Sequence, residues 1–314
     1  MQLEGIHHIT AITADGPRNV DFYARVLGLR LVKQTVNQDD PTAYHLFYAD
    51  EDASHGADLT FFEYPGARRG RAGEGMVERI VHRVASEAAL DFWHERLGGE
   101  GVESEREPGR LRFDDPEGIG HELAVVETSD APLVARSSEV PVEHALQGFE
   151  AVRALVTDPA RSESLLRDAL GFDPTGPHDW EARGEHRGGR IALAEARRRP
   201  GVAGAGTVHH VAWATRLEDQ EAWRARLMEV GARPTPVIDR FYFRSVYFRE
   251  PSGVLFELAT MGPGFAVDEP AEHLGERLSL PPDFEHLRER LEGILRPLPD
   301  TRRWRAAPAK ATHR

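Results

Sequence analysis

The chain has no cysteine among its 314 residues, and this absence removes several kinds of chemistry at once. Disulfide bonds, thiolate metal sites and cysteine nucleophiles are all excluded. A metal site in this protein must therefore be built from histidine, aspartate or glutamate.

A basic surface is also missing, because 52 acidic residues outnumber 39 lysines and arginines and give a formal net charge of -13 at pH 7. This balance argues against nucleic acid as a partner. No apolar run reaches the roughly 20 residues of a membrane span, and the first residues lack the basic and apolar regions of a signal peptide. We therefore expect a cytoplasmic protein that binds neither nucleic acid nor a membrane.

What the sequence does contain is a recurring order of one strand, one helix and three strands, with a period of roughly 50 to 70 residues. The first unit has a strand at 6–13, a helix around 20–27 and further strands up to residue 64. Turns of the form Leu-Gly-Leu or Leu-Gly-Phe recur after Leu27 and Leu170. We predict an α+β fold of four βαβββ modules in tandem, with mixed sheets curled around a metal-containing cavity.

The length of the chain favours about two domains. Residues 1–128 hold two modules and residues 147–260 hold the other two, and a linker with several prolines lies between them at 129–146. Residues 261–296 are a C-terminal extension. Arginine, alanine and proline dominate residues 297–314, which we expect to be a flexible tail.

Two pairs of adjacent histidines occupy the same place in the first and fourth units, His7-His8 and His209-His210. A later strand of the fourth unit carries Glu257. Imidazole nitrogens and carboxylate oxygens are common metal ligands. If the fold brings the first and fourth units together, these strands supply a metal centre.

Strand parity selects one histidine of the second pair, because successive side chains point to opposite faces of a sheet. His209 shares its face with bulky Trp213, which belongs against helices, whereas His210 shares the open face with small alanines. By the same reasoning Glu257 lies opposite the bulky face of its own strand. The repeat then assigns His8 to the place of His210, and parity turns His209 to the opposite side of the sheet.

Two histidines and one carboxylate on one side of a metal leave coordination positions open, as in the facial triad of non-haem Fe(II) oxygenases. The ligand types alone would equally accept Mn(II), Zn(II) or Ni(II). Glu63 ends the strand of the first unit that we align with the Glu257 strand, and as a fourth ligand it would make the site less open to oxygen. We expect His8, His210 and Glu257 to be the ligands.

The second unit also carries a histidine strand and a glutamate strand, with His82 and Glu122. The corresponding stretch of the third unit, 149–153, has no histidine. We interpret His82 and Glu122 as structural remnants of the repeat.

Short stretches at residues 7–10, 19–23, 27–37, 44–48, 60–62, 209–210 and 256–257 carry a resemblance to a known family. They resemble the ring-cleaving dioxygenases of the vicinal oxygen chelate (glyoxalase/bleomycin-resistance/extradiol dioxygenase) superfamily, and within it the hydroquinone and chlorohydroquinone dioxygenases. The resemblance extends through about residue 296. It implies the same metal ligands, the second histidine of each pair and the glutamate of the last strand.

The resemblance also implies which side chains surround the substrate. In the hydroquinone branch an arginine and a tyrosine line the pocket at positions matching Arg240 and Tyr247. An arginine keeps its charge beside a phenolate or an oxygen species, and a tyrosine donates a hydrogen bond or relays a proton. We expect Arg240 and Tyr247 to be catalytic, and His7, His209 and Glu63 to be candidates for residues around the metal or the substrate pocket.

The function implied by the resemblance is an Fe(II)-dependent dioxygenase that opens the ring of a hydroquinone or catechol, with molecular oxygen as the second substrate. A metal-dependent lyase or isomerase of the glyoxalase type is the alternative, favoured if Glu63 is a ligand. A non-enzymatic sequestration protein of the bleomycin-resistance type is a third interpretation, which the matching ligand positions oppose. A homo-oligomer is compatible with the sequence.

Overall fold

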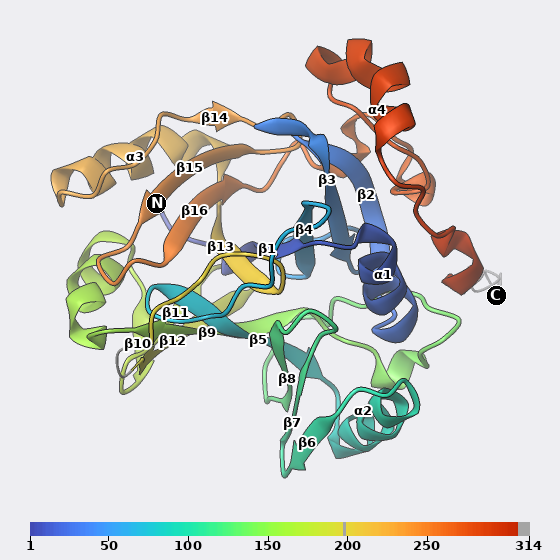
Figure 1. The fold of residues 1–314 in the computed structure, drawn as a ribbon. Helices are drawn as coiled ribbons and strands as arrows, with labels where there is room; N and C mark the ends of the chain where they lie inside the picture. The colour runs from blue at the N-terminus through green and yellow to red at the C-terminus, as the bar shows by residue number, and fades with distance from the viewer. Residues whose placement is uncertain (197–198, 307–314) are drawn as a thin grey trace, which may run out of the picture.

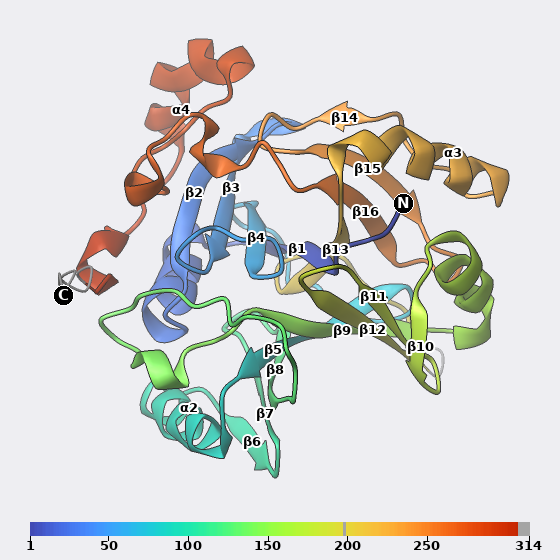
Figure 2. The same cartoon turned by 180° about the vertical axis from the view of Figure 1, so that it is seen from behind.

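The computed structural model describes residues 1–196 and 199–306 and arranges the four modules in two eight-stranded sheets (Figure 1, Figure 2). Each module contributes strands and a helical segment in the βαβββ order that the repeat predicts. The first and fourth modules share one sheet, and the second and third share the other. The predicted α+β fold with mixed, curled sheets is confirmed.

The first sheet is built from β1 (Ile6–Thr13), β2 (Arg30–Asn37), β3 (Asp40–Ala49), β4 (Asp58–Glu63), β13 (Thr207–Thr215), β14 (Ile238–Asp239), β15 (Arg244–Arg249) and β16 (Leu255–Thr260). The strand order is β14-β15-β16-β13-β1-β4-β3-β2. The central strands β1 and β13 are antiparallel, and each is parallel to its outer neighbour, β4 or β16. A pseudo-twofold axis between β1 and β13 therefore relates the first module to the fourth.

The second sheet is built from β5 (Met76–Val84), β6 (Ser104–Glu107), β7 (Arg110–Asp114), β8 (Gly120–Val125), β9 (Phe149–Val156), β10 (Asp173–Gly176), β11 (Asp179–Arg183) and β12 (Gly188–Glu195). Its order is β10-β11-β12-β9-β5-β8-β7-β6. Residues 1–128 and 147–260 thus each give one module to each sheet. Their division into two domains stays a prediction.

The module helices are short, and two of them contain π-helical turns. Asp15 and Ser86 cap the first turns of two helices by accepting hydrogen bonds from backbone amides. Gly28 and Gly171 end two others with φ of 70° and 73°, the left-handed conformation that glycine adopts without strain. The helical segments are α1 (Gly16–Val20) with η1 (Asp21–Val26), α2 (Glu87–Gly99), η3 (Pro159–Ser162) with η4 (Leu165–Ala169), and α3 (Gln220–Glu229).

The alternation of bulky and small side chains along β13 and β16 separates a packed face from a face that leaves room. Trp213 is fully buried on the packed face, with its ring centroid 4.7 Å from Phe172 and 5.6 Å from Phe256. Ala212 and Ala259 belong to a separate apolar cluster on the inner face of the curled sheet. The small alanines keep this inner face open beside His210, as parity predicts.

A buried polar network joins the helical segment of the first module to the second sheet. The Tyr23 hydroxyl donates to Asp115 Oδ2 at 2.9 Å and lies 3.0 Å from His121 Nε2. His121 Nδ1 is in turn 3.1 Å from His82 Nε2. All four side chains are buried. His82 is therefore part of a buried hydrogen-bonded network, and its interpretation as a structural remnant of the repeat stays a prediction.

The C-terminal extension runs along β2, the edge strand of the first sheet, and appears in orange and red beside β2 and β3 in Figure 1. Ser279 N–H donates to Gln34 O at 2.8 Å, and the Gln34 side chain donates to Gly275 O at 2.7 Å. A Cβ atom at Gly275 would lie 2.0 Å from Leu31 O, so only glycine permits this close approach. The segments of the extension are η6 (Phe265–Val267), η7 (Ala271–His273), η8 (Pro282–Leu287) and α4 (Arg288–Ile294).

The prediction of a flexible tail from residue 297 is wrong for residues 297–306. A 3-10 turn, η9 (Thr301–Trp304), buries the indole of Trp304 in the main core. Trp304 O accepts a 2.8 Å hydrogen bond from Ser138 N–H, and Arg305 forms an ion pair with Glu51 at 2.7 Å. One aromatic side chain among charged residues is a weak signal in the sequence. Residues 307–314 lie outside the described residues.

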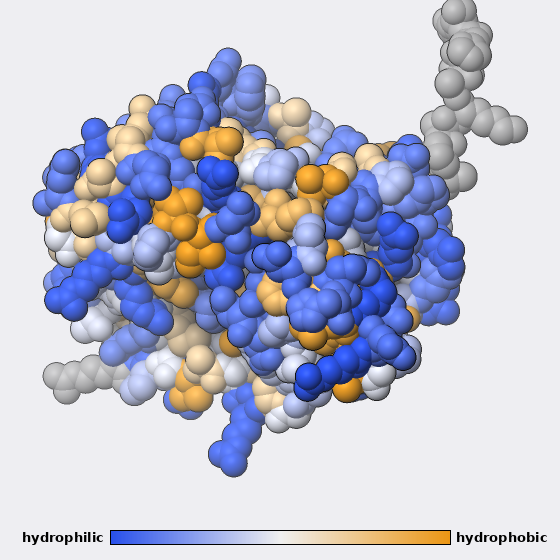
Figure 3. Space-filling model, turned by 90° about the horizontal axis from the view of Figure 1, so that it is seen from above, coloured by the Kyte–Doolittle hydropathy of each residue, from blue (hydrophilic) through white to orange (hydrophobic). Residues whose placement is uncertain are grey.

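The surface seen from above Figure 1 is mostly polar, with apolar side chains in small separate patches (Figure 3). Across the described parts of the chain, no helix combines the length and the apolar composition needed to cross a membrane.

Replacing Tyr23 by phenylalanine should destabilise the protein by about 1–3 kcal/mol, because a buried acceptor would lose its donor. Urea unfolding of the variant and the wild type measures this difference. Tyr64→Phe is the control, since Tyr64 is only partly buried, and loss of the hydrogen bond that its hydroxyl accepts from Asn37 should cost only about 0.5 kcal/mol. Equal free energies of unfolding for the two variants would contradict a stabilising role of the Tyr23 network.

Candidate functional site

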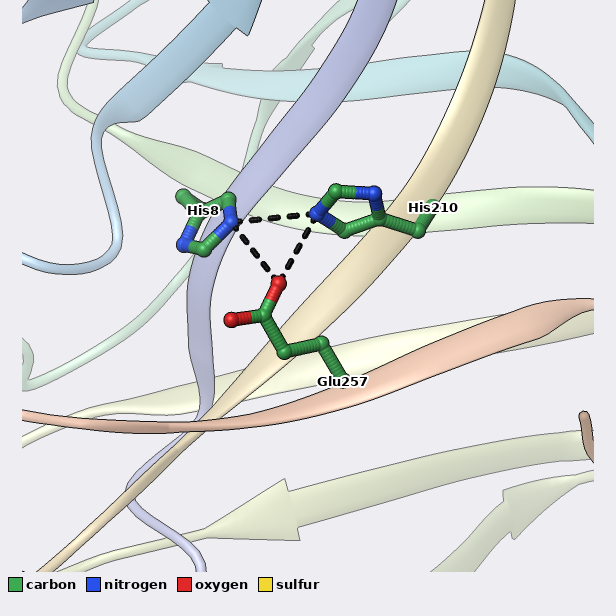
Figure 4. A group of neighbouring side chains, drawn as sticks. All are labelled: His8, His210 and Glu257. Atoms are coloured by element: carbon green, nitrogen blue, oxygen red, sulfur yellow. Dashed lines mark hydrogen bonds and ion pairs between the residues drawn. The ribbon is translucent and has the colours of Figure 1, made fainter. Parts of the chain in front are cut away.

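Three polar side chains meet on the inner face of the first sheet, where β1, β13 and β16 lie side by side. In the β1–β13 ladder His8 pairs with Ala212 and Thr10 pairs with His210. Ala212 also pairs with Glu257 across the parallel ladder to β16. The register therefore brings His8, His210 and Glu257 to one point of the inner face (Figure 4).

The donor atoms of this triad converge closely. His8 Nε2 lies 3.2 Å from both His210 Nε2 and Glu257 Oε2, and His210 Nε2 lies 2.9 Å from the same oxygen. Metal–ligand bonds of about 2.0–2.2 Å place two ligands at right angles about 3 Å apart. The three atoms therefore fit three adjacent positions around one divalent metal ion.

The buried carboxylate of Glu257 supports this fit. The side chain is fully buried, and neither of its oxygens accepts a hydrogen bond with proper geometry. Burial alone would raise its pKa, but the adjacent imidazoles of His8 and His210, when protonated, hold the pKa of Glu257 well below its usual value. A buried carboxylate that stays ionised without donors needs a cation beside it.

The first histidine of each pair holds the ring of the second. His7 Nδ1 lies 2.9 Å from His8 Nδ1, and His209 Nδ1 lies 2.8 Å from His210 Nδ1. His7 Nε2 is 3.1 Å from Thr260 O, which only accepts, so this nitrogen carries the proton of the neutral ring. His7 Nδ1 then accepts from His8 Nδ1–H, and the lone pair of His8 Nε2 faces the site.

His7 is buried, and burial is the main cause that lowers its pKa well below its usual value. His209 is more exposed, and desolvation together with the neighbouring His210 lowers its pKa to about 4. Hydrogen bonds of this kind fix the tautomer and orientation of a metal-ligating imidazole. His7 and His209 thus lie beside the two candidate ligands.

The prediction that His209 faces the opposite side of the sheet from His210 is wrong. The β1–β13 ladder shifts register at two points, and the unpaired residues there are His7 and His209. Such β-bulges set two residues against one and break the alternation of side chains. The prediction from alternating side chains assumes a strand ladder without bulges. The sequence alone therefore does not reveal that the two imidazole rings of each histidine pair lie on the same side of the sheet.

A cavity opens beside the triad and encloses about 430 Å³ of empty space, including the part open to solvent. His8 and His210 form its floor, and Thr10 and Thr35 add hydroxyl groups. Its aromatic lining is Phe47, Phe62, Tyr242, Phe243 and Tyr247. An apolar cavity with a few polar groups suits a small aromatic ligand.

Arg240 and Tyr247 both line this cavity, on the side of His210. The Arg240 guanidinium lies 5.6 Å above the Tyr247 ring and binds both oxygens of Asp39, at 3.0 and 2.8 Å. The Tyr247 ring centroid is 5.6 Å from that of His210. Burial, with the charge of Glu257 adding to it, raises the pKa of Tyr247 well above its usual value, so its hydroxyl remains a hydrogen-bond donor.

A strained turn sets the direction of Arg240 and its neighbours. Phe241 has a φ of 67°, and Tyr242 N–H donates to Arg240 O at 2.8 Å, which together form a γ-turn. Backbone strain of this kind costs about 1–3 kcal/mol and persists only where the surroundings hold it. Gln38 donates to Arg240 O at 2.7 Å, and Asp39 holds the guanidinium. The turn thus fixes one wall of the cavity.

A chain of hydroxyl groups leads from Thr10 in the cavity to the partly buried His45. Thr60 Oγ1 donates to Thr10 Oγ1 at 2.9 Å, and His45 Nε2 lies 2.9 Å from the same Thr60 oxygen. Burial lowers the pKa of His45 well below its usual value, so the ring is neutral. Both ends of this chain, Thr10 and His45, line the cavity.

Glu63 lies apart from the triad, contrary to its placement near the metal or the pocket. Its carboxylate accepts hydrogen bonds from Gly16 N–H at 2.7 Å and from Arg296 at 2.6 Å. The alignment of its strand was shifted: the pseudo-twofold axis relates Thr10 to Ala212, and Thr10 pairs with Thr60 on β4. Thr60, and not Glu63, is the counterpart of Glu257.

The second sheet carries no such triad at its corresponding positions. Its central ladder between β5 and β9 has similar register shifts, and the residues that follow them are Arg79 and Ala151. Glu122 stands in the place of Glu257 but forms ion pairs with Arg112 and Arg153, each at 3.0 Å. The histidine counterpart in this module is therefore Arg79, and His82 was aligned three residues too far along.

Several cavity residues were not singled out by sequence reasoning. Thr10 and Thr60 follow from the ladder register, which a sequence does not display. Asp39 carries no signal of its own, because an exposed aspartate in a turn is common. Tyr242 and Phe243 belong to a run of three aromatic residues that directly follows Arg240, a signal that the sequence does offer.

Comparison with known proteins relates most of the chain to one superfamily. A model of the glyoxalase/bleomycin resistance protein/dioxygenase superfamily matches residues 5–123 and 148–258. The chain is 39% identical to MhqA of Bacillus subtilis (strain 168), named as a ring-cleaving dioxygenase, across 95% of this chain and 100% of that protein. It is 31% identical to a chlorohydroquinone/hydroquinone 1,2-dioxygenase of Sphingobium indicum, across 92% and 95% of the two chains.

Solved structures show the same fold. A crystal structure of a Bacillus subtilis protein described as a dioxygenase superposes with a TM-score of 0.86 at 39% identity, covering 95% of this chain and 98% of that one. Glyoxalase I from Zea mays gives a TM-score of 0.59 at 16% identity, covering 82% and 92%. The second likeness concerns the fold alone.

Replacing His7 by leucine should weaken metal binding by about 10–100-fold, because the His8 ring would lose the acceptor that orients it. Replacing His8 by alanine should abolish binding. Anaerobic calorimetric titration with Fe(II) or Mn(II) measures both effects. His94→Leu is the control on the exposed face of α2 and should bind metal as the wild type does. Wild-type affinity in the His7 variant would refute its orienting role.

Proposed function

Since the chain belongs to the glyoxalase/bleomycin resistance protein/dioxygenase superfamily, we propose that it is a ring-cleaving dioxygenase acting on a hydroquinone-type aromatic. In this proposal His8, His210 and Glu257 hold a non-haem Fe(II) ion. The observation that carries it is the convergence of these three buried donors beside an aromatic cavity. A two-histidine, one-carboxylate set leaves positions open for two reactants.

The substrate class follows from the relatives and from the cavity. One relative is named as a chlorohydroquinone/hydroquinone 1,2-dioxygenase, and others are named as ring-cleaving dioxygenases. The cavity has room for one substituted ring between aromatic side chains, and it offers hydroxyl and guanidinium groups for the oxygens of the substrate. Breaking one ring carbon–carbon bond while adding both atoms of dioxygen needs no external reductant.

Each side chain around the cavity has a distinct task in this reaction. When bound, Fe(II) supplies a Lewis acid for a phenolate and electrons for the activation of oxygen. Arg240 keeps a fixed positive charge near the negative charge that develops on the reactants. The Tyr247 hydroxyl donates a hydrogen bond to the same charge. His7 and His209 hold the ligand rings in position.

The hydroxyl chain supplies a route for the proton that the substrate loses. A phenol that binds as a phenolate must release its proton inside a largely closed cavity. Thr10 would pass a proton to Thr60, and Thr60 to Nε2 of His45, by rotation of the two hydroxyl groups. Because burial lowers the pKa of His45, its ring would hold this proton only transiently. The reverse rotation returns the proton to the ring-opened product. Thr10, Thr60 and His45 are therefore assigned to proton transfer.

The glyoxalase-type alternative is less well supported. This alternative is favoured if Glu63 is a fourth metal ligand. The carboxylate of Glu63 instead accepts hydrogen bonds from the Gly16 amide and from Arg296. The true counterpart of Glu257 is Thr60, a poor metal ligand. The other alternative, a sequestration protein, needs no metal, and the buried carboxylate of Glu257 would then have no cation to compensate its charge. A metal held by only three protein ligands keeps coordination positions open for the substrate and dioxygen, which favours the dioxygenase.

Anaerobic loading with Fe(II), followed by addition of hydroquinone and oxygen, should give uptake of one oxygen molecule for each ring opened. An oxygen electrode and the ultraviolet spectrum of the product measure both. His210→Ala should lose uptake together with stoichiometric iron. No uptake with any hydroquinone or catechol, combined with turnover of a hemithioacetal, would sink the proposal and favour the glyoxalase-type alternative.

Replacing Tyr247 by phenylalanine should lower kcat by about 10²–10⁴-fold, because a positioned hydrogen-bond or proton donor is lost. Iron content and anaerobic binding of hydroquinone should change little, since the ring remains. Steady-state oxygen uptake gives kcat and KM. Tyr44→Phe removes a hydroxyl from a buried tyrosine on β3 outside the cavity and serves as control. A kcat equal to that control would refute the catalytic role of Tyr247.

A further inference from the structure

Tyr242, one of the side chains that line the cavity, is attached to the C-terminal extension in several ways. Its carbonyl oxygen accepts a 2.8 Å hydrogen bond from Gly264 N–H. Its hydroxyl donates to Asp268 Oδ2 at 3.0 Å. Its ring centroid lies 5.4 Å from that of Phe265. Backbone, hydroxyl and ring are thus all held by residues 264–268.

The attachment is fixed by a lysine inside the sheet. Lys33 on β2 is completely buried, and its ammonium donates to Asp268 Oδ1 at 2.8 Å and to the carboxylate of Glu269. The ammonium also donates to Phe265 O at 3.0 Å and lies 4.9 Å above the ring of Tyr242. Buried charges are tolerated only when they are paired and hydrogen-bonded, so none of these groups can leave alone.

Apolar packing holds the same segment against the inner face of the sheet. The Phe265 ring centroid lies 4.8 Å from that of Phe47, which also lines the cavity. Phe265 belongs to one buried apolar cluster with Tyr242, Phe243 and Ala212. The extension therefore fills the part of the inner face beside the cavity and stands directly behind its wall.

We propose that Asp268, anchored by Lys33, is a positioning residue that holds Tyr242 as a fixed wall and so limits which ring substituents the cavity admits. This inference deepens the proposed function and rests on it. Because its hydroxyl, its ring and its backbone all contact the extension, the Tyr242 side chain does not move aside for a bulky substituent. The extension would then determine substrate range without touching the substrate itself.

The size limit has a direct chemical meaning. Tyr242 is one of the side chains that line this small cavity, so a bulky ring substituent directed to that side would meet its ring. Hydroquinone and its small derivatives would bind without moving the wall. A tert-butyl group would bind only if Tyr242 turned away, and that movement would break its hydrogen bond to Asp268.

The test is anaerobic calorimetric binding of hydroquinone and of 2-tert-butylhydroquinone to the Fe(II)-loaded protein, which needs no turnover. In Asp268→Ala the ratio of the two dissociation constants, bulky over small, should fall by about tenfold or more, the scale on which pockets discriminate hydrocarbon groups. General damage to the fold would lower the number of sites and leave this ratio unchanged.

Tyr242→Phe keeps the buried ion pairs and guards against failure of the first variant to fold. It should lower the ratio in the same direction, because only the hydroxyl tie is cut. Ser279→Ala is the matched control, since Ser279 donates to the same Asp268 oxygen at 2.6 Å but does not line the cavity. Its ratio should equal that of the wild type.

The possible outcomes separate this inference from the proposed function. Hydroquinone binding by the wild type with an unchanged ratio in Tyr242→Phe, and in Asp268→Ala where it folds, would overturn the inference alone. An equal shift in Ser279→Ala would also overturn it, because the ratio would then follow the carboxylate and not Tyr242. A wild type that binds neither compound would overturn the proposed function, and the inference with it.

Discussion

The antiparallel pairing of β1 with β13 is the interaction on which the site depends, because it joins residues about two hundred positions apart in one ladder. The pairing alone sets His8 beside His210. Its two bulges, at His7 and His209, turn each neighbouring ring to the same side and give it a hydrogen bond to the candidate ligand. A regular ladder would preserve the ligands but lose the groups that orient them. The irregularity is thus part of the site.

Burial of Glu257 sets a second constraint, because an ionised carboxylate inside a sheet must be compensated. The two sheets solve this problem differently at the same position. In the second sheet, Arg112 and Arg153 neutralise Glu122 by ion pairs. In the first sheet no arginine among the described residues forms an ion pair with Glu257, and two imidazoles in their neutral form leave its charge for a metal ion. Metal binding would therefore stabilise the fold as well as the site.

The sequence predicted those features that depend on periodicity and failed where they depend on register. The repeat identified the modules, and alternation of bulky and small residues placed His210 and Glu257 on the inner face. Bulges and relative strand shifts leave no periodic signal, so Glu63 was taken for the counterpart of Glu257 in place of Thr60. The docking of Trp304 depends on a surface formed by distant residues, and composition suggested only disorder.

The extension couples the edge of the first sheet to its interior. A strand such as β2 that ends a sheet exposes unpaired backbone groups, and proteins usually cover them. Here the cover includes the contact of Ser279 with Gln34, and the close approach at Gly275 admits no side chain. The same segment inserts Asp268 next to the buried Lys33. Because one segment both protects the edge and supports the cavity, a substitution that loosens the edge would also widen the range of aromatic rings admitted.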